Sequence, residues 1–404
     1  MAMFGGAGGA GGAGGAGGAG GAGGAGGAGG AGGAGGAGGS LLGTLADAYV
    51  NSIMVDALIH GREGTADPND STRYGPKLND KTIDDANDLE RWEPWVRAYT
   101  AIGDALQGIV FGFVDTAAAK EVSVNFVTTT GSQTIATMDR PTRETFDKQL
   151  NLVLSWAELR EERATEIMAQ IDPTYAFWSS VLYLHPARTR WTFELINVVL
   201  QFCVYVEMRF KHALGCWRPV EYNAQVQPMI TTPGHGAFPS GHCTQSYAVA
   251  YVLGQLLKLD ASFGVPPQGT GPKVRAQLDL QAARISTNRV VAGVHFPADS
   301  MAGRMLGTAL GEFFVARCGA ATSFKNRKFR STYLNATANQ SLDFNPFDPE
   351  QNLDTSTATT LYQLVGTHNV SAAGTGPKSP APVLEYLWGK AVQEWQGRFG
   401  YLVP

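Results

Sequence analysis

Three short segments of the chain carry side chains suited to holding an oxyanion. In the first, KHALGCWRP (211–219), Lys211 and Arg218 stand seven residues apart. On a continuous helix they would share one face, about 10 Å apart along its axis, and could bracket one anion. Pro219 is expected to end that helix and leave the guanidinium of Arg218 near its C-terminus. Taken alone, such a pair is more often a solvated helix face.

The second segment, FPSGH (238–242), comes directly before a long apolar run. This order places the Ser240 hydroxyl and the Gly241 backbone N–H at a helix N-terminus, where free N–H groups and the helix dipole favour an anion. His242 is expected to face the same pocket, and a histidine that titrates near neutrality suits general acid-base catalysis. The alternative is a plain serine N-cap on a buried helix, which would explain Ser240 but not the histidine.

The third segment, NRVVAGVH (288–295), supplies Arg289 and His295, and Asp299 follows four residues later. A carboxylate at this offset could accept a hydrogen bond from one imidazole nitrogen and leave the other as a nucleophile or as the ligand of a central atom. Two histidines and three cations form a coherent set. Their target is expected to be tetrahedral or trigonal bipyramidal, with several anionic oxygens.

Helical periodicity dominates the segments that must position these residues. Helices are predicted at 41–61, 82–112, 140–171, 191–215, 242–259, 272–285, 297–317 and 383–397. Only 121–138 has the β-branched residues and central Thr-Gly-Ser of strands. Residues 319–382 are rich in Asn, Ser, Thr, Gly and Pro and are expected to wrap over the surface. The predicted fold class is therefore all-α.

The first 39 residues differ from the rest of the chain because 5–39 repeat Gly-Gly-Ala. Such a segment offers almost no side chain to bury, so 1–39 is expected to be a flexible leader and 40–404 a single helical catalytic domain. The alternative is an ordered glycine-rich assembly. The N-terminus shows no cationic flank before an apolar run, so no secretory signal is expected and the default location is cytoplasmic.

Composition argues against several classes of protein. The net charge of −4 and the pI near 6.0 do not favour a nucleic-acid surface. The most apolar long stretch, 191–210, is interrupted by polar and acidic residues, so it is expected to be a buried helix and not a membrane span. Scattered cysteines without a CxxC pair indicate reduced core thiols, at Cys203, Cys216, Cys243 and Cys318.

Taken in order, K-x6-RP, PSGH and R-x5-H-x3-D resemble the superfamily shared by type 2 phosphatidic acid phosphatases, bacterial class A acid phosphatases and vanadium-dependent haloperoxidases. The resemblance spans 211–299 and, by the order of helices, about 150–318. It implies an all-α helical bundle with long loops that holds phosphate or vanadate.

The resemblance also implies a role for each motif residue. Those that match oxyanion-binding positions are Lys211, Arg218, Ser240, Gly241 and Arg289. His242 matches the acid-base residue, and His295 matches the residue that bonds to phosphorus or vanadium. Asp299 would support His295.

The length of the chain and the helical region before the first motif are similar to the haloperoxidases. Lipid phosphatases of the superfamily have several membrane spans, and the class A phosphatases are shorter and exported. His235 lies seven residues before His242, the offset at which algal bromoperoxidases carry an extra histidine; the alternative is a loop histidine with no role. Asn288 and Met208 depart from the family patterns, and Asp299 fits the phosphatase pattern at least as well.

The resemblance therefore implies a vanadate-dependent haloperoxidase that oxidises bromide or iodide with hydrogen peroxide, pairs as a homodimer and passes the halogen to an organic acceptor. Catalysis is expected from His242, Lys211 and His235, with Lys211 contacting the activated peroxide. The alternative enzyme is an acid phosphatase that hydrolyses phosphate monoesters through a phosphohistidine. A third hypothesis is a non-catalytic protein that binds phosphate or vanadate, or that assembles through the Gly-Gly-Ala leader.

Overall fold

The computed structural model describes residues 52–72, 75, 82, 85–116, 120–128, 131–171, 174–260, 270–370 and 380–401. Contacts divide the chain into two units, with the change at residues 83 and 84. In the first, helix α3 (Ser52–Thr65) buries none of its side chains. It confirms the C-terminal part of the helix predicted at 41–61. The leader and the expected domain boundary at residue 40 lie outside the described residues.

The second unit combines helices with one β-sheet, so the prediction of an all-α fold is wrong. Its helices and strands are α4 (Pro94–Leu106), β1 (Ile109–Asp115), β2 (Lys120–Thr128), β3 (Gly131–Asp139), α5 (Arg143–Trp156), α6 (Arg160–Ala169), α7 (Tyr175–Leu182), α8 (Arg190–Leu214), α9 (Pro219–Tyr222), α10 (Gly241–Leu256), α11 (Thr270–Val291), α12 (Pro297–Arg317), β4 (Ser323–Phe329), α13 (Ser331–Asn335), β5 (Tyr362–Asn369) and α14 (Pro382–Gln393). Short 3₁₀ turns lie at Leu89–Arg91, Ala157–Leu159, Ala224–Val226, Pro349–Gln351 and Phe399–Tyr401.

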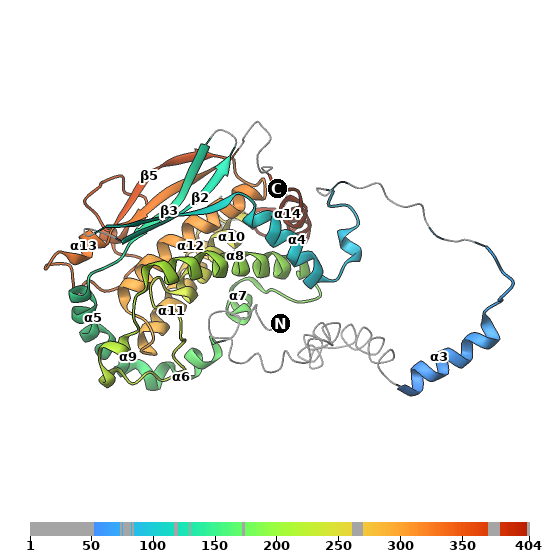
Figure 1. The fold of residues 1–404 in the computed structure, drawn as a ribbon, viewed down its shortest axis with the longest axis horizontal. Helices are drawn as coiled ribbons and strands as arrows, with labels where there is room; N and C mark the ends of the chain where they lie inside the picture. The colour runs from blue at the N-terminus through green and yellow to red at the C-terminus, as the bar shows by residue number, and fades with distance from the viewer. Residues whose placement is uncertain are drawn as a thin grey trace. The chain divides into compact units, whose positions relative to one another are not determined.

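The five strands form one mixed sheet in the order β1-β2-β3-β4-β5. All neighbouring pairs are antiparallel except β3 and β4, which run parallel. Helix α12 lies along the sheet, with α8 and α10 beyond it (Figure 1). The ring of Phe313 on α12 is centred 5.2 Å from Phe126 on β2 and 5.2 Å from Phe324 on β4. The sheet thus covers one side of the helical core.

Two strands that the sequence did not predict are β1 and β4. β1 was included in the helix predicted at 82–112, but α4 ends at Leu106 and Gly108 has a positive φ of 82° that breaks the helix. β4 lies within 319–382, and its sequence SFKNRKF is strongly polar. Arg327 nevertheless lies buried in this strand, because Glu312 at 2.7 Å and Asp354 at 2.8 Å neutralise its charge.

Most of the other predicted elements are confirmed. The segment 121–138 forms the β2–β3 hairpin, and 191–215, 242–259, 297–317 and 383–397 correspond closely to α8, α10, α12 and α14. The helix predicted at 140–171 is capped by Thr142, whose hydroxyl accepts from the Thr145 N–H, but a 3₁₀ turn divides it into α5 and α6. α11 continues to Val291, beyond its predicted end at 285.

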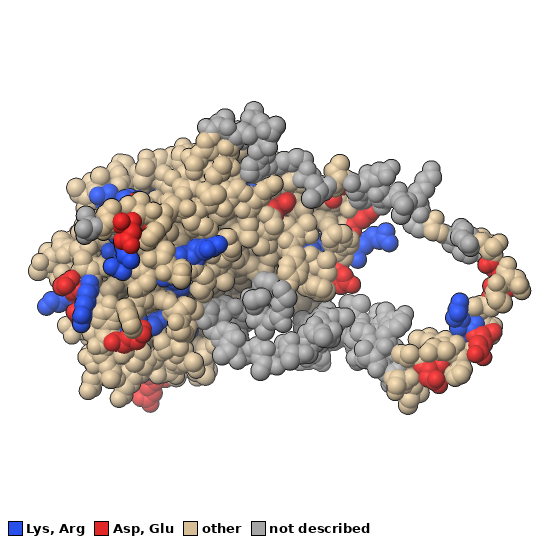
Figure 2. All heavy atoms as spheres, viewed as in Figure 1, with Lys and Arg blue, Asp and Glu red and all other residues tan. Residues whose placement is uncertain are grey.

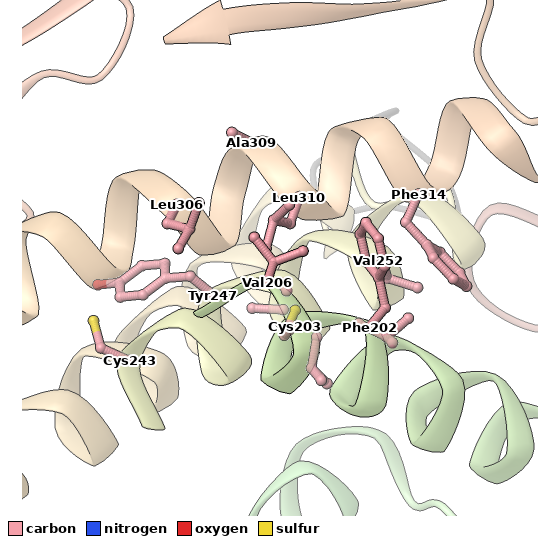
Figure 3. Close-up of a cluster of buried hydrophobic side chains, with 14 of the residues drawn as sticks. Phe202, Cys203, Val206, Cys243, Tyr247, Val252, Leu306, Ala309, Leu310 and Phe314 are labelled. Atoms are coloured by element: carbon pink, nitrogen blue, oxygen red, sulfur yellow. The ribbon is translucent and has the colours of Figure 1, made fainter. Parts of the chain in front are cut away.

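Helices α8, α10 and α12 form the centre of the apolar core. Figure 3 shows side chains from all three helices directed toward one another, among them Val206, Val252 and Leu310. The four cysteines are all buried and unpaired, as predicted. Within the described residues one helical segment, Arg190–Tyr222, is long and apolar enough to be a candidate membrane span, and 61% of its most apolar window is buried inside this fold. A buried core helix gives the same signal.

Three glycines on α12 allow it to approach α10 at backbone distance. Gly303, Gly307 and Gly311 recur every four residues and so lie on one face of the helix. A Cβ at Gly307 would lie 2.1 Å from the Thr244 carbonyl oxygen, and one at Gly303 would lie 2.7 Å from that of Ser240. At the start of the two helices, the Ser240 N–H donates to the Asp299 carbonyl at 2.8 Å. The contact therefore fixes the second motif segment against the third.

We expect Gly307→Ala to lower the free energy of unfolding by about 3 kcal/mol, because the new methyl group would overlap the Thr244 carbonyl and force the two helices apart. The matched control is Gly389→Ala on α14, where a Cβ would meet nothing within 4 Å. That change should be neutral or stabilising by up to about 1 kcal/mol. Urea unfolding of both variants measures the difference, and equal stability of the two would contradict the close contact.

Candidate active site

The three motif segments meet at the ends of four long helices. Lys211 lies in the last turn of α8, Arg289 in the last turn of α11, and Ser240 is the N-cap residue of α10. His242 follows in the first turn of α10, and His295 lies just before α12. The site is thus assembled from helix termini.

Lys211 and Arg218 do not share a helix, so that part of the prediction is wrong. α8 ends at Leu214, and Gly215 adopts a left-handed conformation (φ 58°) that terminates it. Pro219 begins the short helix α9 instead of ending α8, and Arg218 precedes it in an extended conformation. The backbone N–H of Arg218 donates to Glu221 at 2.6 Å. This reversal of the chain brings the guanidinium to His295.

His295 is held between a carboxylate and a guanidinium. Its Nδ1 lies 2.9 Å from Asp299 Oδ2, and its Nε2 lies 2.9 Å from Arg218 Nη1. Because a guanidinium can only donate, the hydrogen-bond network assigns the proton to Nδ1 and a lone pair to Nε2. Burial, reinforced by the charge of Arg218, lowers the pKa of His295 well below its usual value. The predicted pairing with Asp299 is present, and the imidazole is neutral with its lone pair directed at a cation.

Arg218 also joins His235 to this cluster. Its Nη2 lies 3.1 Å from His235 Nδ1, and its Nη1 donates to the Val294 carbonyl at 2.8 Å. Burial lowers the pKa of Arg218 to about 10, so the side chain is still cationic at neutral pH. His235 therefore contacts the site through Arg218, while its role in catalysis stays a prediction.

Lys211 is buried, and its ammonium group holds the loop that leads to α10. Nζ donates to the carbonyls of Gly236 at 3.1 Å and Ala237 at 3.0 Å, and also to that of Pro239. Burial and the charge of Arg218 lower the pKa of Lys211. The three protons are thus directed at three carbonyls, and the predicted contact of Lys211 with an oxyanion stays a prediction.

Ser240 and Arg289 present buried polar atoms that have no partner in the described structure. The Ser240 hydroxyl does not cap α10 and makes no hydrogen bond, and the Nε and Nη1 of Arg289 are likewise unpaired. Only Nη2 of Arg289 is used, donating to Gln170 Oε1 at 2.9 Å and to the Ile167 carbonyl at 3.3 Å. Folded proteins rarely leave such groups unsatisfied. Three donors of this kind fit a ligand with acceptor oxygens.

Gln170 is a site residue that the sequence analysis missed. Its backbone carbonyl accepts from His242 Nε2 at 2.9 Å, and its side-chain Oε1 accepts from Arg289 and, at 3.0 Å, from Asn288 Nδ2. The Gln170 side chain is fully buried at the end of α6. A lone glutamine after a helix carries no motif, so no sequence signal pointed to it. It fixes the orientation of one cation and one histidine together.

His242 has its Nδ1 lone pair available because Nε2 donates to Gln170. Burial, followed by the charge of Arg289, lowers the pKa of His242 to about 3. The histidine is therefore neutral at physiological pH. A bound anion would raise this pKa, because opposite charge favours the imidazolium.

Residues 191–321 match the family model described as the PAP2 superfamily, and this segment contains all the motif residues. The suspected superfamily resemblance is therefore confirmed. Members of the superfamily are enzymes, either phosphatases or haloperoxidases. No curated protein sequence gives a significant match to the chain. Among the described residues no group of three or more His, Cys, Asp or Glu side chains could hold a metal ion.

Replacing Gln170 with leucine should weaken binding of orthovanadate and of phosphate about tenfold, because Arg289 would lose the acceptor that orients it while His242 keeps its backbone partner. Isothermal titration calorimetry measures the affinity. The control is Gln201→Leu, which removes a buried glutamine that bonds to Asn197 on α8. Reduced stability with unchanged anion affinity would show that Gln170 is only structural.

The depressed pKa of His242 predicts an acid-dependent loss of stability. The unfolded chain takes up a proton at this histidine near pH 6.5, whereas the folded protein takes it up only near 3, so stability falls as pH decreases through this window. His242→Gln removes this contribution. From about pH 7 to about pH 4, the difference in unfolding free energy, wild type minus variant, should fall by up to roughly 3 kcal/mol. Denaturant titrations at both pH values in phosphate-free buffer measure it, and a constant difference would contradict a neutral His242.

Proposed function

We propose that this chain, with its PAP2-superfamily segment at 191–321, is a vanadate-dependent haloperoxidase that oxidises bromide or iodide with hydrogen peroxide. The observation that carries the proposal is the neutral His295, paired with Asp299 on one side and facing the Arg218 guanidinium with its lone pair. The contact of His235 with Arg218 supports the haloperoxidase branch, because this histidine occupies the offset of the extra histidine in bromoperoxidases.

The residues of the pocket fit vanadate. His295 Nε2 would bond to vanadium, and the unpaired donors of Arg289 and Ser240, together with Arg218, would hold its anionic oxygens. When bound, vanadate supplies a Lewis-acid centre that makes hydrogen peroxide electrophilic toward halide. The fit depends on buried donors that have no other acceptor.

The protein supplies orientation, charge and a proton site. Asp299 holds the proton on His295 Nδ1 and so keeps Nε2 as the binding atom. Arg218 and Arg289 are fixed cations that stabilise negative charge without reorganising. His242 Nδ1 accepts a proton from hydrogen peroxide and returns it to the departing oxygen. The net reaction is H₂O₂ + Br⁻ + H⁺ → HOBr + H₂O, in which bromide is oxidised and peroxide oxygen is reduced.

The Asp299–His295 pair also favours a second candidate, an acid phosphatase. Here His295 Nε2 attacks phosphorus, and Asp299 stabilises the imidazole as it becomes positively charged. Arg218 and Arg289 hold the equatorial oxygens, and His242 protonates the leaving alkoxide. Water then releases phosphate from the phosphohistidine.

His295→Ala should abolish retention of orthovanadate on gel filtration, because it removes the only bond to the central atom. His242→Ala should retain vanadate and lose halide turnover by about 100-fold or more, since it removes only proton transfer. Equal vanadate retention by wild type and His295→Ala would disprove the ligand assignment.

Two parallel assays separate the candidates. Phosphate-free protein incubated with orthovanadate is tested for bromination of a dye with hydrogen peroxide and bromide, and vanadate-free protein for hydrolysis of an aryl phosphate. Vanadate-dependent bromination far above the blank is the expected result. Phosphate release that vanadate inhibits, without bromination, would replace the haloperoxidase with the phosphatase.

A further inference from the structure

We propose that two adjoining cavities beside Arg218 form one binding groove for an aromatic organic anion, which serves as the halogen acceptor. The role as acceptor rests on the proposed function, whereas binding of the anion does not.

The first cavity adjoins the oxyanion site at Arg218. It has a volume of about 420 Å³, and its lining includes Arg218, His235 and Trp217. Because Arg218 Nη1 lies 2.9 Å from His295 Nε2, a molecule in this cavity is one side chain away from the reacting nitrogen. Ser240, His242, Arg289 and His295 are not among its lining residues. The organic molecule would therefore lie beside the oxyanion site and not replace the anion.

The second cavity adjoins the first. It has a volume of about 500 Å³ and shares Gly215, Cys216, Trp217 and Glu221 with the first. Phe146 and Tyr222 add aromatic surface to its wall. Each volume falls in the range typical of small-molecule sites. Together they can hold a molecule with a ring system and a substituent at its far end.

Trp217 lines both cavities and is the clearest sign of an aromatic ligand. It is 63% exposed, the largest exposed fraction among the described tryptophans. Its place follows from the chain reversal after α8, where Gly215 ends the helix and Arg218 turns inward one residue later. A large apolar ring left in solvent at a cavity is suited to stacking on a flat ligand.

The far end of the groove is cationic. Arg140 and Arg143 line the second cavity, next to the N-terminus of the 14-residue helix α5. Within the described structure the Arg140 side chain makes one hydrogen bond, from Nη1 to the Leu214 carbonyl at 3.2 Å, which leaves its other donors for a ligand. The carboxylate in the wall, Glu221, already accepts from the Arg218 N–H. Figure 2 shows basic and acidic side chains gathered on the part of the second unit that α5 and α9 occupy in Figure 1.

These placements define the ligand as a flat aromatic body with an anionic substituent. The ring stacks on Trp217, the anionic group faces Arg140 and Arg143, and the opposite edge of the ring lies beside Arg218 and His235. Hypohalous acid that leaves the oxyanion site would reach this edge of the ring. The step is ArH + HOBr → ArBr + H₂O, in which a C–H bond is replaced by C–Br and the released proton joins the hydroxide of HOBr as water.

The test measures binding of naphthalene-2-sulfonate by equilibrium dialysis, with orthovanadate present so that the sulfonate does not occupy the oxyanion pocket, and with inorganic phosphate in a parallel series. Trp217→Ala should weaken binding about tenfold through loss of stacking, and Arg140→Gln about fivefold through loss of one cation. The controls are Trp95→Ala, which removes another exposed indole (52%), and Arg188→Gln, which removes another exposed cation. Both controls should bind as wild type does.

Three outcomes would overturn the groove: no binding of the sulfonate to wild-type protein, equal binding by Trp217→Ala and wild type, or equal affinity for a neutral naphthalene derivative such as 2-naphthamide. Failure of the haloperoxidase assignment is separate, because it appears as absent vanadate-dependent bromination while sulfonate binding persists. If both hold, Trp217→Ala should raise the KM for 6-hydroxynaphthalene-2-sulfonate as acceptor about tenfold.

Discussion

The backbone contact between α10 and α12 determines where the chemistry of this protein is located. Glycines on α12 let the two helices approach until side-chain atoms would overlap carbonyl oxygens, and the N–H of Ser240 reaches the carbonyl of Asp299 at 2.8 Å. The segment that carries His242 and the segment that carries His295 are then joined at their first turns. A larger residue in place of one of these glycines would push α10 and α12 apart. It would thereby separate His242 from His295 without touching either side chain.

Burial sets the charge states of the groups assembled in this way. Removal from water favours neutral imidazoles, so His242 and His295 both have lowered pKa values, whereas Arg218 and Arg289 remain cations because a guanidinium loses its proton only at much higher pH. The pocket therefore holds positive charge beside neutral bases. The proposed oxyanion would supply the missing counter-charge, and its negative charge would raise the pKa of His242 and so make it a better proton acceptor.

The sequence predicted the motif segments and most helices because their signals are local. Helix periodicity and the order of the three motifs each involve neighbouring residues. The sheet was missed for the opposite reason: Arg327 is tolerated in β4 only because Glu312 and Asp354, from elsewhere in the chain, pair with it. Gln170 was missed because its importance lies in partners more than a hundred residues away. The continuous helix through Lys211 and Arg218 was wrong because Gly215 acts as a stop signal.

The position of Gln170 changes what counts as the smallest complete unit of this protein. It lies outside the segment 191–321 that matches the superfamily, yet it accepts hydrogen bonds from His242 and Arg289. Phe126 of the sheet, also outside that segment, lies against Phe313 on the helix that carries Asp299. A fragment limited to the matched residues would keep every motif. It would lose Gln170, which orients His242 and Arg289. Boundaries drawn from motif similarity alone would therefore divide the pocket.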